Sequence, residues 1–346
     1  MNNSMCLLIP SDPRSPNSME SAMEIIEELP QLLVLGPPSV FTVHEQEFST
    51  KFHVLKPYES PLSTEIYLQT HGQSVRALLC YGKTPVTAQL LRLLPSLQLV
   101  MAAGTGVNQI DLPECRRLGI SVVNTGHVFS EDTADYAVGL LIDVLRKISA
   151  GDRHVRRGAW PVNGDYSLGV KLGGKRVGIV GLGNIGSKVA RRLEAFGCII
   201  SYNSRTKKSS VPYNFYPNVF ELALHSNILV ICCSLTEQTR HMINKDVMTA
   251  LGKDGIIVNV GRGPIIDESE LVKFLVDGDI AGAGLDVFEN EPSVPKDLYG
   301  LDNVVITPHR AAFTQEAFFE AFKILVANLE AFFSNKPLIT PIYIGE

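Results

Sequence analysis

The chain has 346 residues, more than one hydrophobic core usually serves, so two domains are expected. Hydrophobic residues make up 45% and charged residues 19%, and the formal net charge of -5 argues against a nucleic-acid binder with a broad basic face. No apolar run approaches a membrane span and no targeting signal is recognisable, so we expect a cytoplasmic protein with no membrane partner.

Short apolar runs alternate with longer amphipathic segments after residues 1–30, which we predict to be a flexible extension. Such runs, bounded by Gly and Pro, are typical of strands buried on both faces, and their alternation with helices predicts parallel sheets. Five runs lie early and six late: 32–36, 52–57, 75–82, 97–104, 120–126, 175–183, 198–205, 228–235, 255–263, 281–288 and 303–309. The sequence therefore predicts an α/β protein with two parallel sheets.

A helix is predicted between the two sets of strands, beginning near Ser130, and a polar, glycine-rich arm follows it near 146–174. Residues 314–337 form a strongly apolar helix that needs a sheet to cover. The six cysteines show no metal-ligand spacing, so we expect reduced thiols and no metal site. The predicted apolar face of the helix that begins near Ser130 comprises Ala137, Leu140, Leu141, Val144 and Leu145.

The segment VGIVGLGNIGSKVARRLEAFG carries a G-x-G-x-x-G spacing directly after a predicted strand and before a predicted helix. These glycines permit a tight turn, the approach of a pyrophosphate and close packing of the helix, whose N-terminus favours phosphate. The residues assigned to the cofactor here are Gly181, Leu182, Gly183, Asn184, Ile185 and Gly186. The predicted buried face of the helix comprises Ile185, Val189, Leu193 and Phe196.

The next strand runs into the basic sequence SYNSRTKK, at the place where an acid would bind the ribose 2′-hydroxyl of NAD. A 2′-phosphate explains the absence of an acid, because Arg205 offers a planar fork while Ser204 and Thr206 offer hydroxyls. Lys207 or Lys208 can add a point charge. The alternative is a basic turn that is simply solvated. Because SYNSRTKK stands where the ribose of the cofactor is bound, we favour NADP(H) over NAD(H) as the cofactor.

Three late strands run into Arg262, Glu291 and His309. Ligands of open α/β sheets bind beyond the carboxyl ends of strands, so these residues are expected beside the dinucleotide. A general acid, a carboxylate that orients it and an anion-binding guanidinium suit the reduction of a 2-oxo acid.

The motifs GRGPIIDESEL, GAGLDVFENEP and ITPH occur in the order and spacing of a known family. Beyond about residue 30 the chain resembles the D-isomer-specific 2-hydroxyacid dehydrogenases, and VRRGAW and SYNSRTKK are most similar to plant hydroxyphenylpyruvate, hydroxypyruvate and glyoxylate reductases. The resemblance implies two flavodoxin/Rossmann-like domains. The substrate domain would comprise 1–126 plus 310–346, with the NADP-binding domain, 127–309, inserted into it and the arm joining a homodimer.

The resemblance also implies roles for single residues. Arg262 would hold the substrate, His309 would donate the proton as hydride arrives, and Glu291 would hydrogen-bond His309 and favour its charged form. Backbone N–H groups of Thr105 and Gly106 would grip the substrate carboxylate. By the same comparison the cofactor would also contact Thr133, Ser234, Val260, Gly261 and Asp286.

Three positions depart from the family's pattern. Arg310 and Phe313 stand where relatives carry smaller residues, and Ser234 stands where relatives often carry Pro. The substrate is therefore open among hydroxypyruvate, glyoxylate and 4-hydroxyphenylpyruvate. Two alternative hypotheses are a glyoxylate and hydroxypyruvate reductase without an aromatic substrate, and a nucleotide-sensing, corepressor-like binding protein of the same fold.

Overall fold

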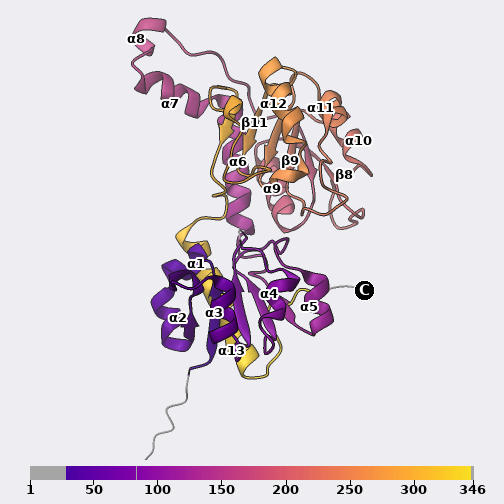
Figure 1. Cartoon of the computed structure of the whole chain (residues 1–346). Coiled ribbons are helices and arrows are strands. Elements are labelled where there is room, and N and C mark those ends of the chain that lie inside the picture. Colours follow the sequence, from indigo (N-terminus) through magenta and orange to yellow (C-terminus); the bar gives the residue numbers. More distant parts are fainter. Residues whose placement is uncertain (1–28, 83, 344–346) are drawn as a thin grey trace, which may run out of the picture.

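The computed structural model describes residues 29–82 and 84–343, so the predicted N-terminal extension lies almost wholly outside the described residues. The chain folds into two lobes, each built on a parallel sheet with helices on both faces (Figure 1). Helices connect most of the successive strands and return the chain to the same edge of each sheet, which makes those strands parallel. The predicted α/β class with two parallel sheets is confirmed.

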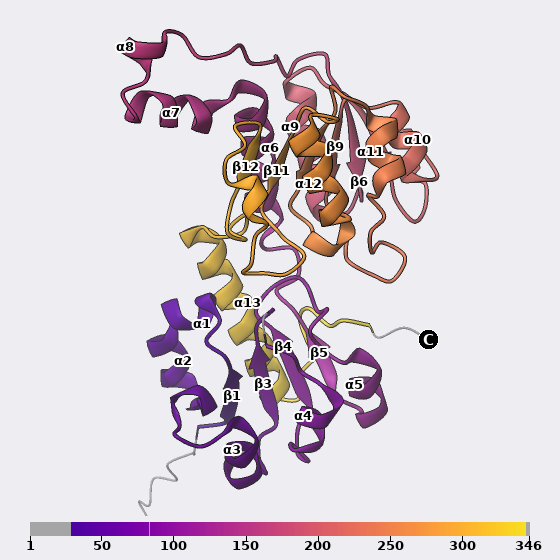
Figure 2. The same ribbon diagram turned by 45° about the horizontal axis from the view of Figure 1, so that its top comes forward.

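The first lobe holds a five-stranded sheet. Its elements are β1 (Gln31–Leu35), α1 (Ser39–Val43), α2 (Glu45–Lys51), β2 (His53–Leu55), η1 (Pro57–Glu59), α3 (Thr64–His71), β3 (Ala77–Cys80), α4 (Ala88–Arg92), β4 (Leu99–Ala102), α5 (Leu112–Leu118), β5 (Ser121–Val123) and, from the end of the chain, α13 (Gln315–Phe333). The strand order is β2-β1-β3-β4-β5. Leu68 and Leu91 pack on one face of the sheet, and Leu325 and Leu329 of α13 pack on the other (Figure 2). The return of α13 shows that the second lobe is inserted into the first.

The second lobe holds a seven-stranded sheet. Its elements are α6 (Ser130–Arg146), β6 (Arg176–Val180), α9 (Asn184–Ala195), β7 (Ile199–Asn203), β8 (Asn214–Phe215), α10 (Val219–Leu224), β9 (Ile228–Ile231), α11 (Lys245–Leu251), β10 (Ile256–Asn259), η2 (Gly263–Ile265), α12 (Glu268–Asp277), β11 (Gly282–Leu285), η3 (Lys296–Leu298) and β12 (Val304–Ile306). The order is β12-β11-β10-β9-β6-β7-β8. The proposed domain boundaries, 126/127 and 309/310, fall in the loops that join β5 to α6 and β12 to α13.

Two local features differ from the sequence-based expectation. The edge strand β8 was not predicted, because its two residues carry no apolar run. The buried face predicted for α9 is right for Val189 and Leu193 and wrong for Phe196, which is 47% exposed. The helix ends at Ala195, and Gly197 then adopts φ 75°, so Phe196 leaves the helical face.

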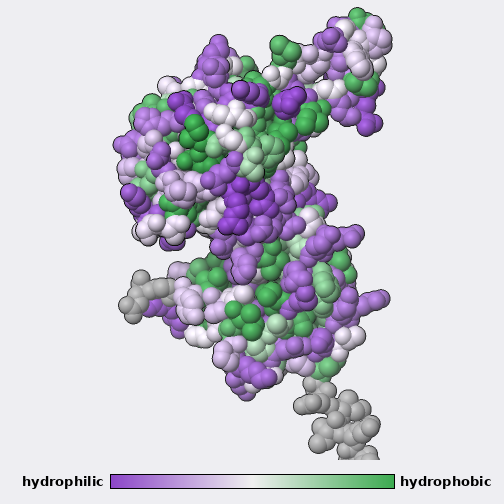
Figure 3. Space-filling view, turned by 180° about the vertical axis from the view of Figure 1, so that it is seen from behind, coloured by the Kyte–Doolittle hydropathy of each residue, from purple (hydrophilic) through white to green (hydrophobic). Residues whose placement is uncertain are grey.

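The arm consists of α7 (Ile148–Arg156), α8 (Trp160–Asn163) and an extended return, and it projects from the second lobe (Figures 1 and 2). Lys147, at φ 54°, turns the chain out of α6, and Arg153 anchors α7 by donating to Asp302 at 2.8 Å. Seen from behind, the arm stands clear of the lobe and carries both hydrophilic and hydrophobic side chains (Figure 3). Its most exposed apolar residues are Val162 and Leu168, at 81% and 92%.

No helix in the described ranges is long and apolar enough to cross a membrane. The five cysteines among those residues are free thiols, and burial raises the pKa of Cys80 to about 12. Residues 29–82 and 84–343 contain no group of three or more His, Cys, Asp or Glu placed to hold a metal ion.

Candidate active site

A cavity of about 660 Å³ is lined by residues of both lobes. Tyr81 follows β3 and Ala103 follows β4, while Val260 and Asp286 follow β10 and β11. The carboxyl ends of parallel strands share one edge of a sheet, so the residues that follow them converge. The predicted site residues that line this cavity are Thr105, Gly106, Thr133, Ile185, Val260, Arg262, Asp286, Glu291 and His309.

His309 follows β12 and is paired with Glu291. Its Nδ1 lies 2.8 Å from Glu291 Oε2, and Glu291 Oε1 accepts a hydrogen bond from the Phe288 N–H at 3.2 Å. The carboxylate favours a proton on Nδ1, which leaves Nε2 as the ring nitrogen that can meet a ligand in the cavity. This geometry suits a group that transfers a proton to or from a bound substrate.

Asp286, which is 1% exposed, holds the loop that carries His309. Its Oδ1 accepts hydrogen bonds from Thr307 Oγ1 at 2.7 Å and the Arg310 N–H at 2.8 Å, and its Oδ2 accepts from the Ala311 N–H at 2.9 Å. The Asp286 carbonyl accepts from the His309 N–H at 2.8 Å. These bonds hold His309 at φ 55°, a left-handed conformation that a non-glycine residue rarely adopts unaided. The family resemblance implied a place beside the cofactor for Asp286, and no pattern in the sequence predicts this anchoring role.

Arg262 leaves the turn after β10 and meets the first lobe. Its Nη1 donates to Gly261 O at 2.7 Å, and the buried Asn259 holds the same turn through Gly261 N–H and Arg262 O, both at 3.0 Å. Burial lowers the pKa of the guanidinium, and the nearby Glu291 carboxylate opposes this. A β-carbon built on Gly106 would lie 2.0 Å from Arg262 Nη2, so a side chain at Gly106 would displace the guanidinium.

The two lobes are also joined by a hydrogen bond across the cleft. Asn108 Nδ2, from the first lobe, donates to Leu235 O of the second lobe at 2.9 Å. Thr105 is held in the neighbouring loop because its carbonyl accepts from Asn124 Nδ2 at 2.7 Å. The contacts of Gly106 and Asn108 therefore set the spacing of the lobes at the cavity. In the view from behind, the lobes meet at a narrow, mostly hydrophilic junction (Figure 3).

The glycine loop has the shape of a phosphate cradle. Gly181 adopts φ 95°, and a β-carbon there would lie 2.7 Å from the backbone of Cys233. A β-carbon on Gly186 would lie 2.1 Å from Gly181 O, whereas one on Gly183 would meet nothing within 4 Å. The loop thus requires glycine on its packed side and is open at Gly183, so these residues fit a dinucleotide pyrophosphate.

The other residues assigned to the cofactor differ in position. Leu182 is buried under the loop, and Asn184 is the first residue of α9. Ser234 is exposed and its carbonyl accepts from Thr239 Oγ1 at 2.8 Å. Gly261 is buried, and a β-carbon there would lie 3.0 Å from Cys233 O. None of these four lines the cavity, although each lies shortly after a strand of the second sheet, at the carboxyl edge of that sheet.

The basic loop after β7 is ordered by its own hydrogen bonds. Tyr202, which is fully buried, accepts through its hydroxyl from the Lys208 N–H at 2.7 Å. Ser204 Oγ donates to Thr206 O at 2.7 Å, so its proton is used within the loop. The exposed residues of the loop's basic stretch are Arg205, Thr206 and Lys207. The loop therefore presents its cations to the solvent from a fixed backbone.

Comparison with known proteins identifies the family. The sequence profile described as "D-isomer specific 2-hydroxyacid dehydrogenase, NAD binding domain" matches residues 138–311. A glyoxylate/hydroxypyruvate reductase of Arabidopsis thaliana is 52% identical to this chain over 91% of its length and 98% of the relative's. The chain belongs to the D-isomer-specific 2-hydroxyacid dehydrogenase family. It is an oxidoreductase.

Other members agree in length and fold. The hydroxyphenylpyruvate reductase of Plectranthus scutellarioides is 46% identical over 90% of this chain and 98% of its own. The NADPH-dependent glyoxylate/hydroxypyruvate reductase of Sinorhizobium meliloti, solved in complex with NADP and malonate, superposes with a TM-score of 0.83 at 34% identity. That match covers 91% of this chain and 97% of the solved one. The predicted resemblance to the family and its plant reductases is confirmed.

The two residues that depart from the family pattern after His309 take different places. Phe313 lines the cavity, and its ring centroid lies 5.0 Å from that of Phe318 on α13. Arg310 is exposed, and its guanidinium carbon lies 4.6 Å from the centre of the Phe313 ring. Phe313 is thus part of the cavity wall, and Arg310 packs against it as a cation–π partner.

Several cavity residues were missed from the sequence. Tyr81 directly follows β3, so the rule that placed ligands at strand ends could have found it. Val40 of α1 and Phe318 of α13 also line the cavity, although their helices are far apart in the chain. No local signal marks such residues, because only the packed first lobe brings the two helices together.

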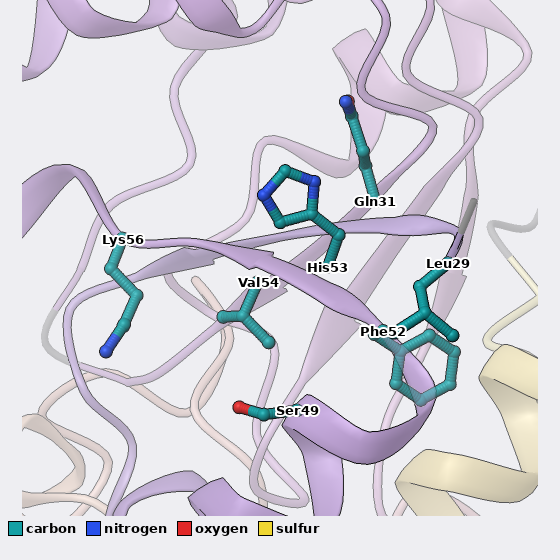
Figure 4. Close-up of a pocket in the computed structure, with 7 residues that line it drawn as sticks. All are labelled: Leu29, Gln31, Ser49, Phe52, His53, Val54 and Lys56. Atoms are coloured by element: carbon teal, nitrogen blue, oxygen red, sulfur yellow. The ribbon is translucent and has the colours of Figure 1, made fainter. Parts of the chain in front are cut away.

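A second hollow lies along β2 and shares no lining residue with the first (Figure 4). Its one lysine, Lys56, is already engaged by Glu45 and Glu59 at 2.6 and 2.8 Å. The residues lining it are Leu29, Gln31, Ser49, Phe52, His53, Val54 and Lys56. The hollow contains none of the predicted site residues, and we assign it no catalytic role.

Proposed function

We propose that the protein reduces a small 2-oxo acid to the D-2-hydroxy acid with NADPH. The observation that carries this proposal is the His309–Glu291 pair, which shares one cavity with the Arg262 guanidinium. The relatives named glyoxylate/hydroxypyruvate reductase and hydroxyphenylpyruvate reductase support the reaction class, and favour an enzyme over a nucleotide-sensing binding protein.

The substrate carboxylate binds at the contact between the lobes. We assign the carboxylate to the backbone N–H groups of Thr105 and Gly106 and to the Arg262 guanidinium, because all three residues line the cavity and Gly106 lies against Arg262. A planar guanidinium can bond a carboxylate oxygen and the 2-oxo oxygen together, and partial burial strengthens both bonds. Binding therefore orients the carbonyl group toward His309.

His309 completes the reduction by giving up a proton. When bound, the nicotinamide supplies the hydride. His309 donates a proton from Nε2 to the carbonyl oxygen as that oxygen gains negative charge, and Glu291 stabilises the imidazolium before transfer. Asp286 keeps the ring in place by holding its loop. A positioned acid of this kind contributes roughly 10²–10⁴-fold to the rate.

The preference for NADPH rests on the loop after β7. Arg205 and Lys207 present positive charge from a backbone fixed by Tyr202, at the place where the 2′-substituent of the cofactor is read. The Sinorhizobium meliloti relative, described as NADPH-dependent, supports this choice. The candidate substrates are hydroxypyruvate, glyoxylate and 4-hydroxyphenylpyruvate.

We also propose that the arm joins two copies of the chain. Its exposed apolar residues, among them Trp160, Val162 and Leu168, have no place in the packing of either lobe. Burying such side chains against a second copy gives a reason for an arm that leaves the lobe. A cytoplasmic location stays a prediction from the sequence.

The proposed function is tested at the acid pair. His309→Gln should lower kcat at least about 100-fold with any of the three substrates and leave the dissociation constant for NADPH unchanged. In Glu291→Gln the fall of kcat/KM with rising pH should move to lower pH, because the carboxylate that favours the protonated ring is lost. Near-normal turnover by His309→Gln, followed through NADPH oxidation, would remove His309 as the acid.

A further inference from the structure

The loop that carries Glu291 makes two further contacts, one through a second histidine–glutamate pair and one through another glutamate. His241 Nε2 lies 2.7 Å from Glu289 Oε1. The Glu289 N–H donates to Glu268 Oε2 at 2.9 Å. Glu289 is two residues before Glu291, so both contacts act on the short segment that places the Glu291 carboxylate on His309.

The same segment packs directly against the turn of Arg262. A β-carbon built on Gly263 would lie 1.9 Å from the Phe288 carbonyl carbon and 2.4 Å from Glu289 N, so the two loops touch backbone to backbone. The His241 N–H donates to Pro264 O at 2.8 Å, which ties this histidine to the Arg262 turn as well. His241 therefore bridges the loop of the anion-binding arginine and the loop of Glu291.

The charges in this cluster are costly to bring together. Burial raises the pKa of the Glu268 carboxyl, the hydrogen bond from the Glu289 N–H opposes the rise, and the carboxylates of Glu289 and Glu291 add to it. An uncharged acceptor could satisfy the Glu289 N–H without this repulsion. The ionised carboxylate is therefore costly at this position, and its bond to the Glu291 loop is the hydrogen bond that it accepts from the Glu289 N–H.

We propose that Glu268 is a positioning residue for the proton donor. Its carboxylate fixes the Glu289 N–H so that Glu291 stays on His309 Nδ1, and His241 supports the same segment through the Glu289 side chain. The inference rests on the proposed function, because it assumes that Glu291 controls His309. Neither Glu268 nor His241 lines the cavity, so both act through other residues.

The test compares two glutamates in the first turn of α12. Glu268→Ala frees the Glu291 loop, whereas Glu270→Ala removes a carboxylate that contacts Lys273 on the helix surface. Both variants lose a similar interaction with the helix dipole, so Glu270→Ala controls for that loss. Misplacing a catalytic group by about 1 Å can cost up to about 100-fold, and we expect a fall of about tenfold in kcat for Glu268→Ala alone.

A second readout separates positioning from folding. The fall of kcat/KM with rising pH should move to lower pH in Glu268→Ala, and Glu268→Gln should restore the wild-type profile because its amide oxygen still accepts the Glu289 N–H. The raised pKa makes ionised Glu268 less favourable in the folded chain than in the unfolded chain, so its contribution to stability falls as pH rises through that titration. Glu268→Gln should accordingly melt no lower than wild type at neutral pH.

A variant outside α12 keeps the proposal testable if Glu268→Ala does not fold. His241→Ala should move the pH profile in the same direction by a smaller amount, because the Glu268 contact remains. If the Glu291→Gln profile moves but those of Glu268→Ala and His241→Ala match Glu270→Ala, the positioning role is wrong. If Glu291→Gln itself leaves the profile unchanged, the proposed function fails at its acid pair instead.

Discussion

Replacing Arg205 with alanine should weaken the binding of NADPH and leave that of NADH almost unchanged. Arg205 is exposed and makes no hydrogen bond or ion pair with another residue that the structure describes, so its loss should leave the fold intact. The loop backbone is held by Tyr202 and Ser204, whose bonds do not involve the Arg205 side chain. The perturbation is therefore confined to one cation at the proposed 2′-phosphate site.

The expected size follows from the kind of bond that is lost. Hydrogen bonds to a charged group are worth about 1.5–3 kcal/mol, and about 1.4 kcal/mol corresponds to tenfold in a dissociation constant. Because Arg205 is open to solvent and salt, the lower part of this range applies, which gives about ten- to thirtyfold weaker NADPH binding. NADH carries no 2′-phosphate, so its dissociation constant should change by less than about twofold on the same reasoning.

The measurement is a titration of wild type and Arg205→Ala with both cofactors, followed by nicotinamide fluorescence at low and high salt. Arg191→Ala serves as the matched control, because it removes an equal charge from an exposed position on α9. Tyr202→Phe should give a smaller loss for NADPH, since it removes the bond to Lys208 N–H and leaves the cation. Equal losses for NADH and NADPH in Arg205→Ala would refute the assignment of this loop to the 2′-phosphate.

Two further predictions concern the substrate. Arg262→Lys keeps the charge but loses the planar fork, so it should raise KM and lower kcat together, each about tenfold or more, with every 2-oxo acid tested; wild-type constants across the panel would place Arg262 outside the substrate site. Phe313→Ala enlarges the cavity beside Phe318 and should raise kcat/KM for 4-hydroxyphenylpyruvate relative to glyoxylate by about tenfold, the lower end of the effect of one methylene group in a hydrophobic pocket. Unchanged relative rates would show that Phe313 does not border the substrate.

Local patterns were sufficient for most of the fold. The near-continuous apolar runs predicted eleven of the strands to within a few residues, since burial on both faces is recorded in each run itself. The two-residue strand β8 was not predicted, because it is defined by its pairing with β7 at the edge of the sheet and not by an apolar pattern. Phe196 was misplaced because helical periodicity does not say where the helix ends.

The candidate site divides in the same way. Arg262, Glu291 and His309 could be predicted because each directly follows a strand or its loop, and parallel strands bring their carboxyl ends together whatever the details of packing. The glycine loop could also be predicted, because the close contact that requires glycine at Gly186 is with Gly181, only five positions away. For these residues the pattern along the chain was enough to predict their place, and the chemistry assigned to them stays a prediction.

The residues that support Arg262, Glu291 and His309 could be found only from the packing of the two lobes. The contact of Gly106 with Arg262 and the bond from Asn108 to Leu235 join residues more than 100 positions apart, and they depend on how the two lobes meet. The use of Asp286 as an anchor for the His309 loop depends on three N–H and O–H groups that fold around one carboxylate. No periodic pattern in the sequence predicts such contacts, because each depends on how whole helices and strands pack and not on the spacing of neighbouring residues.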